Sequence, residues 1–152
     1  MKILYIGFKG QRNSSCQLVS SMPGDKYFLT NSFTGVKKDI DCIQGSYDAV
    51  CLFGLGKTLI DSIRIELFVE ADGHILHTNA DIASLSRKLD GLGIQYAASE
   101  KPTHFLCNEA YYCLLQRMTC PVLLIHIPSQ RNFSEKLFSQ LLTAFTFETF
   151  TI

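Results

Sequence analysis

The chain has 152 residues, of which 47% are hydrophobic, and its 14 lysines and arginines equal its 14 aspartates and glutamates. This length supports one buried core and is too short for two ordinary domains, so we expect a single domain over residues 1–152. The balanced charge, without a basic stripe, argues against a nucleic-acid or anionic-membrane partner and favours a peptide or a small neutral ligand.

Hydropathy and cysteine spacing narrow the class of protein further. No apolar run is long enough to span a membrane, and the N-terminal MKILYIGFKG reaches a glycine turn before a cleavable leader could form, so we expect a cytoplasmic protein. The six cysteines contain no CxxC pair, and several lie in apolar runs, where free cysteine behaves as a small hydrophobic residue. We therefore expect no disulfide framework, no metal site and no cofactor.

Strands and helices are predicted to alternate along the first half of the chain. The apolar run Lys2–Phe8 predicts a strand, and Asn13 or Ser14 can cap the short helix that follows. We expect a second strand at Lys26–Thr30, a helical turn at Val36–Ile43 and a strand buried on both faces at Asp48–Gly54.

The second half begins with an alternating strand, Ile63–Ala71, and Asp72-Gly73 then predicts the turn of an antiparallel hairpin completed by His74–His77. Helices are expected over residues 81–90, after Cys107 and over 134–145, strands over 94–99 and 122–127, and a short tail, FETFTI, over 147–152. Together these elements predict an α/β fold, a three-layer α/β/α sandwich around a mixed, largely parallel sheet with one β-hairpin.

Two patterns that suggest binding sites fail on spacing. FGLGKT, residues 53–58, follows a buried strand, but a P-loop requires glycine where this chain has Cys51, so the cradle of backbone amides is incomplete. The glycine turn still faces the crevice where α/β proteins bind ligands. His74 and His77 lie three residues apart on a strand, which places them on opposite faces rather than around one metal ion.

Cys107, in THFLCNEAYYCLLQRM, is the candidate nucleophile. It lies at the predicted N-terminus of a helix, where unpaired backbone amides and the helix dipole stabilise a thiolate and lower the thiol pKa. Cys113 and Cys120 fall on the helix body and before the next strand, and we interpret them as core residues.

His126, in LLIHIP, is the candidate base for Cys107. If the strand that precedes Cys107 and the strand that carries His126 are parallel neighbours, both residues reach the carboxyl edge of the sheet, where open α/β folds bind ligands. The alternative interpretation, a buried thiol and a core histidine, stays open on these residues alone.

The segments THFLCNEAYYCLL and LLIHIP resemble the cysteine and histidine motifs of the pyroglutamyl peptidase I family (pyrrolidone-carboxylate peptidases), T-F-V-C-N-x-x-x-Y-x-L-L and F-I-H-V-P. IGF, NSS and TNADIASLSRKLDGLGI are similar to further segments of the family in the same order. The resemblance covers most of the chain and implies a single pyroglutamyl-peptidase-like domain.

The resemblance also implies roles for individual residues. Cys107 would be the nucleophile and His126 its base, and Glu66, in the I-x-x-E pattern of IRIE, would orient the imidazole. Four residues would contribute to the substrate site: Phe8, Asn13, Gly54 and Lys57.

The implied function is that of a cysteine hydrolase, a thiol protease that removes an N-terminal pyroglutamyl or similar small acyl group through a thioester intermediate. The N-terminal loop GFKGQ keeps Phe8 but lacks the family's second phenylalanine, which indicates a shortened and divergent member with an altered pocket. The alternative is a catalytically inactive member that binds a small ligand or a protein. The resemblance further suggests a homo-oligomer, with aromatic residues near the tail at its interface.

Overall fold

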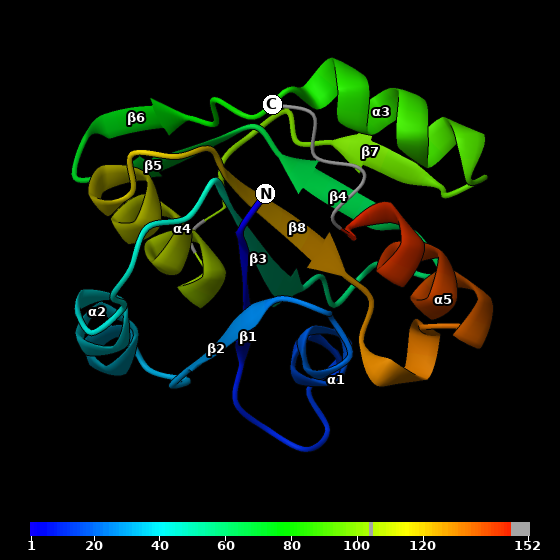
Figure 1. Ribbon diagram of the computed structural model, residues 1–152, viewed down its shortest axis with the longest axis horizontal. Helices are drawn as coiled ribbons and strands as arrows, with labels where there is room; N and C mark the ends of the chain where they lie inside the picture. The colour runs from blue at the N-terminus through cyan, green and yellow to red at the C-terminus, as the bar shows by residue number, and fades with distance from the viewer. Residues whose placement is uncertain (104, 147–152) are drawn as a thin grey trace.

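The computed structural model describes residues 1–103 and 105–146, and Figure 1 shows a central sheet with helices on both faces. The predicted tail at 147–152 lies outside the described residues. In chain order the elements are β1 (Ile3–Phe8), α1 (Ser14–Ser20), β2 (Asp25–Leu29), α2 (Phe33–Asp41), β3 (Ala49–Leu55), β4 (Ile63–Glu66), β5 (Phe68–Ala71), β6 (His74–His77), α3 (Ile82–Gly91), β7 (Tyr96–Ala98), α4 (Leu106–Arg117), β8 (Val122–Ile127), a 3₁₀ turn (Gln130–Asn132) and α5 (Glu135–Ala144).

The main sheet has the strand order β2-β1-β3-β8-β4-β7. Strands β2, β1, β3 and β8 are parallel, whereas β4 runs antiparallel to β8 and parallel to β7. The prediction of a mixed, largely parallel sheet is therefore confirmed. The condition that the strand before Cys107 and the His126 strand are parallel neighbours is not met, because β4 lies between β7 and β8 and β7 runs opposite to β8.

Helices cover both faces of the sheet, as Figure 1 shows, and each layer packs apolar side chains against it. Helices α1, α3 and α5 pack on one face, and α2, α4 and the β5–β6 hairpin pack on the other. Side chains alternate along β1, so that Tyr5 enters the first layer and Ile6 the second. A strand buried on both faces requires the continuous apolar run that the sequence shows, and the predicted three-layer sandwich is confirmed.

The predicted strand Ile63–Ala71 is two strands in two sheets, which corrects the sequence interpretation. The backbone amide of Leu67 donates to Ser99 Oγ at 3.1 Å, and its carbonyl accepts from the amide of Thr78 at 2.9 Å. These contacts divert the chain from β4 in the main sheet to β5 in the hairpin. The hairpin turn itself is as predicted, since Asp72 and Gly73 both have positive φ, 51° and 76°.

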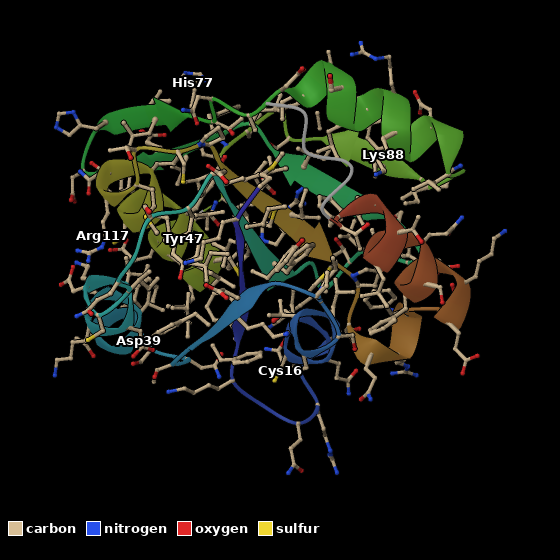
Figure 2. The ribbon with its side chains drawn as sticks, in the orientation of Figure 1. Cys16, Asp39, Tyr47, His77, Lys88 and Arg117 are labelled. Carbon is tan, nitrogen blue, oxygen red and sulfur yellow. The ribbon has the colours of Figure 1, made fainter. Side chains whose placement is uncertain are left out.

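Helix α2 is a complete helix rather than the predicted turn, and its end is tied to α4. It begins after Ser32, whose Oγ accepts from the amide of Gly35 at 3.0 Å. Arg117, at the end of α4, extends toward the end of α2 (Figure 2) and donates to the carbonyls of Asp41 and Ile43. Among the described residues, no helix has the length and apolar character of a membrane span.

Candidate active site

Antiparallel pairing of β4 with β8 brings a histidine, a glutamate and an arginine to one face of the sheet. Arg64 lies opposite His126, and Glu66 lies opposite Leu124. Residues two apart on a strand share a face, so Arg64, Glu66 and His126 all point toward the α4 side. Glu66 and His126 are buried within this layer, with side chains 0% and 1% exposed.

The Glu66 carboxylate is the hub of these contacts. Its Oε1 lies 2.6 Å from His126 Nδ1 and accepts from Arg64 Nε, also at 2.6 Å. Burial raises the pKa of the Glu66 carboxyl, but the hydrogen bonds from His126 and Arg64 outweigh burial and hold the pKa below its ordinary value. An ionised carboxylate only accepts, so the proton of the imidazole is on Nδ1 and Nε2 is free to act as a base.

Arg64 is a member of the site that the sequence analysis missed. Its guanidinium NH2 lies 3.3 Å from His126 Nδ1, in addition to the bond from Nε to Glu66. The alternation in IRIE carried the signal, because it places Arg64 on the same side of the strand as Glu66.

Cys107 is the second residue of α4, and a glycine brings it against the sheet. Gly54 lies opposite His126 in the β3–β8 pairing. A Cβ atom added to Gly54 would be 2.4 Å from Cys107 Sγ and 3.4 Å from His126 Cδ2. The absence of that atom lets the thiol lie over β3 beside the imidazole. The structure thus brings Cys107, His126 and Glu66 together from three separate elements.

Helix α4 holds Cys107 in this position from outside the sheet. Because β7 runs opposite to β8, the thiol reaches His126 through the packing of α4 on the sheet and not through a neighbouring parallel strand. Tyr111, one turn further along α4, donates its hydroxyl to the carbonyl of Glu66 at 3.0 Å. This bond ties the helix of the cysteine to the strand of the glutamate.

The expected low thiol pKa is wrong. Burial raises the pKa of the Cys107 thiol, and the backbone amides of Leu55 and Cys107 lower it by a smaller amount. The net result is a pKa of about 11. Cys107 is therefore a protonated thiol at neutral pH. The pairing of β1 with β3 ends at Leu52, which leaves the amide of Leu55 available to the sulfur.

Cys107 and His126 share the wall of a cavity of about 430 Å³. Three of the predicted substrate residues, Phe8, Asn13 and Lys57, also line it, whereas Gly54 lies beneath Cys107 instead of on the wall. The remaining lining residues are Asn31, Leu55, Gly56, Thr58, Arg64, Phe105 and Leu106. The lining combines apolar side chains, which suit an acyl group, with polar side chains that can fix its orientation.

The other cysteines singled out in the sequence lie away from these contacts. Cys113 and Cys120 are partly buried and pack against the layer that contains α2 and α4. Burial raises the pKa of each thiol above its ordinary value. Both are consistent with the predicted packing role.

We find no protein-family model and no curated protein that matches this sequence. Solved structures do match the fold. Pyrrolidone carboxyl peptidase from Thermus thermophilus superposes with a TM-score of 0.79 at 17% identity, over 97% of this chain and 99% of that chain. Pyroglutamyl peptidase I from Bacillus amyloliquefaciens gives 0.71 at 17% identity, over 94% of each chain. A mutant pyrrolidone carboxyl peptidase from P. furiosus gives 0.75 at 17% identity, over 95% of this chain and 94% of that chain. The protein has the fold of the pyrrolidone carboxyl peptidases.

Proposed function

We propose that this protein is a cysteine hydrolase of the pyroglutamyl-peptidase type, with Cys107 as nucleophile, His126 as general base and Glu66 as the residue that orients the imidazole. The observation that carries the proposal is the 2.6 Å contact between His126 Nδ1 and Glu66 Oε1 behind a cavity lined by both His126 and Cys107. The fold that the protein shares with solved pyrrolidone carboxyl peptidases also supports a cysteine hydrolase.

The first half of the reaction forms a thioester. His126 Nε2 removes the thiol proton as the sulfur of Cys107 attacks the carbonyl carbon of the N-terminal acyl group, which forms the C–S bond and an oxyanion. Because the resting thiol is protonated, this proton transfer accompanies the attack. The backbone amides of Leu55 and Cys107, which lower the pKa of the thiol, are the donors available to the oxyanion.

The second half releases both products. The oxyanion reforms the carbonyl, the C–N bond breaks, and the His126 imidazolium gives its proton to the leaving amine. His126 then takes a proton from water, and the resulting hydroxide attacks the thioester and breaks the C–S bond. The Cys107 thiolate recovers its proton from the imidazolium, while Glu66 stays ionised throughout.

The proposed substrate is a peptide or small molecule with an N-terminal pyroglutamyl or similar small acyl group. Phe8 and the apolar wall formed by Leu55, Phe105 and Leu106 would pack against the acyl group. A cytoplasmic location and a homo-oligomer with aromatic residues near the tail at its interface stay predictions, and the tail itself lies outside the described residues.

Release of a fluorescent amine from a pyroglutamyl amide tests the proposal. We expect the wild-type protein to release the amine, Cys107→Ala to lose release completely, and Cys113→Ala, a matched thiol on the same helix, to retain it. No release by the wild-type protein would refute the pyroglutamyl group as substrate, and equal release by Cys107→Ala would refute Cys107 as the nucleophile.

The raised pKa of Cys107 favours one alternative, a catalytically inactive protein whose cavity only binds its ligand. Calorimetric titration with a pyroglutamyl peptide separates the two functions. A binding module would bind the peptide equally well before and after Cys107→Ala and would leave it intact. A hydrolase would cleave the peptide in the wild type, and only the Cys107→Ala variant would bind the peptide and leave it intact.

A further inference from the structure

The cavity that contains Cys107 has an excess of positive charge. Two of its lining residues, Lys57 and Arg64, are charged, and both are cations. Glu66, buried behind the wall, offsets the charge of Arg64 through the 2.6 Å contact with Nε. Lys57 is exposed and takes part in none of the ion pairs formed by the described residues. One positive charge therefore faces the cavity without a counterion from the described part of the chain.

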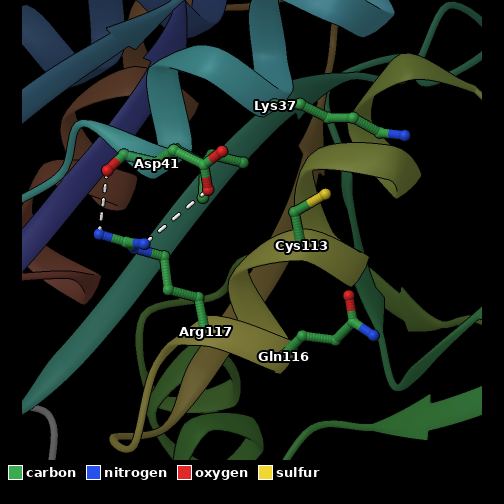
Figure 3. A pocket seen from close by; sticks show the side chains of 6 residues that line it. Lys37, Asp41, Cys113, Gln116 and Arg117 are labelled. Carbon is green, nitrogen blue, oxygen red and sulfur yellow. Dashed lines mark hydrogen bonds and ion pairs between the residues drawn. The ribbon is translucent and has the colours of Figure 1, made fainter.

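The cavity between α2 and α4 provides a contrast (Figure 3). It also contains two cations, but Lys37 lies 3.3 Å from a Glu109 oxygen, and Arg117 lies 3.8 Å from an Asp41 oxygen. Arg117 also donates to the carbonyl of Asp41. Both cations at that cavity are paired within the chain, whereas the ammonium of Lys57 at the cavity with Cys107 forms no ion pair with another described residue.

Lys57 lines the same cavity as Cys107 and His126. Lys57 comes two residues after Leu55, whose backbone amide lowers the pKa of Cys107, and two residues span at most about 7 Å. Asn13 supplies a further donor at the same wall. Its Oδ1 accepts from the amide and hydroxyl of Ser15, and its NH₂ group donates to none of the residues that the structure describes. Ammonium and amide N–H groups together suit an anionic oxygen ligand.

We infer that Lys57 forms a carboxylate-binding subsite and that the substrate carries a carboxylate next to the scissile amide. The inference rests on the proposed function for its substrate class. A pyroglutamyl lactam and the interior of a peptide are uncharged and do not require an ammonium group. The carboxylate could belong to the leaving amino acid, as in a dipeptide, or to a dicarboxylic acyl group.

Alkylation of Cys107 tests the subsite without any substrate. Iodoacetate carries a carboxylate and iodoacetamide does not, so the ratio of their rates reports attraction of an anion to the cavity. We expect this ratio at Cys107 to be about tenfold higher than for a small neutral thiol, the size of a charge-assisted contact at a partly exposed site. Salt should lower the ratio, because it screens the charge of Lys57.

Three variants complete the alkylation test. Lys57→Met should bring the rate ratio down to that of the small thiol, and Lys57→Arg should keep most of it. Lys38→Met, which removes an exposed lysine on α2, is the matched control and should leave the ratio unchanged. A ratio that equals that of the small thiol in the wild type, or that survives Lys57→Met, would overturn the subsite whether or not the protein is an enzyme.

Two matched substrate pairs identify the source of the carboxylate. Pyroglutamyl-alanine against its amide tests the leaving side, and a glutaryl anilide against a butyryl anilide tests the acyl side. We expect the carboxylate member of one pair to have about tenfold higher kcat/KM, and Lys57→Met to remove that preference. Equal kcat/KM within both pairs would overturn the inferred substrate class. No turnover of any of the four, with the iodoacetate preference intact, would refute the proposed hydrolase and leave the subsite standing.

Discussion

Gly54 is the residue that permits the close approach of Cys107 to His126. A methyl group there would lie 2.4 Å from Cys107 Sγ, so Gly54→Ala must displace the thiol or the helix that carries it. We expect alkylation of Cys107 by iodoacetamide to change by tenfold or more, amine release to be lost, and the free energy of unfolding to fall by about 1–3 kcal/mol. Alkylation kinetics and urea denaturation measure these effects.

Gly91→Ala is the control for that substitution. Gly91 lies in α3, and a Cβ atom added there meets no other atom within 4 Å. Alanine should leave alkylation of Cys107 at the wild-type rate and change the free energy of unfolding by less than about 0.5 kcal/mol, because Gly91 is the last residue of α3 and has room for a methyl group. Wild-type alkylation in Gly54→Ala would contradict the described contact between Gly54 and Cys107.

Glu66 links stability to pH. Because its pKa is lowered in the folded state from an ordinary value of 4.5, the carboxylate stabilises the fold above that pH, and the contribution is lost as pH falls through the folded-state pKa. We expect the stability of the wild type to fall more steeply with acidification than that of Glu66→Gln, which cannot titrate. Urea denaturation between about pH 3 and pH 7 measures both slopes. Parallel curves would show that Glu66 is not an ionised partner of His126.

At the scale of elements, a comparison of two helix caps distinguishes an effect on stability from an effect on the cavity. Asn13 caps α1 and lines the cavity, whereas Ser32 caps α2 away from it. Replacing either by alanine should lower the free energy of unfolding by about 1 kcal/mol. Asn13→Ala alone should also reduce the iodoacetate preference of Cys107. Equal effects of Asn13→Ala and Ser32→Ala on the iodoacetate preference would show that Asn13 does not act at the cavity wall.

The elements that the sequence predicted well are those with local signals. Apolar runs predicted β1, β3 and β8, and a polar cap at Asn13 or Ser14 predicted the start of α1. The division of the predicted strand at Leu67 had no local signal, because the apolar alternation continues from β4 into β5. Pairing partners far along the chain, Ser99 and Thr78, decide where that strand divides.

At the scale of the whole molecule, the site combines residues from β3, β4, β8 and α4. Motif resemblance predicted Cys107, His126 and Glu66, and the structure places them together, but the roles stay proposals. The thiol pKa was predicted in the wrong direction, because position at a helix N-terminus is visible in the sequence, whereas burial depends on the packing of distant elements. Arg64 was missed, although its alternation with Glu66 could have revealed it.

The central claim is that Cys107 accepts an acyl group from the substrate. Intact-mass measurement of protein quenched rapidly after mixing with a pyroglutamyl ester tests it most directly, because an ester acylates faster than an amide. We predict a mass increase of one pyroglutamyl group on Cys107 in the wild type, decay of the adduct by hydrolysis, and no adduct in Cys107→Ala. An adduct on another residue, or no adduct at all, would contradict the account.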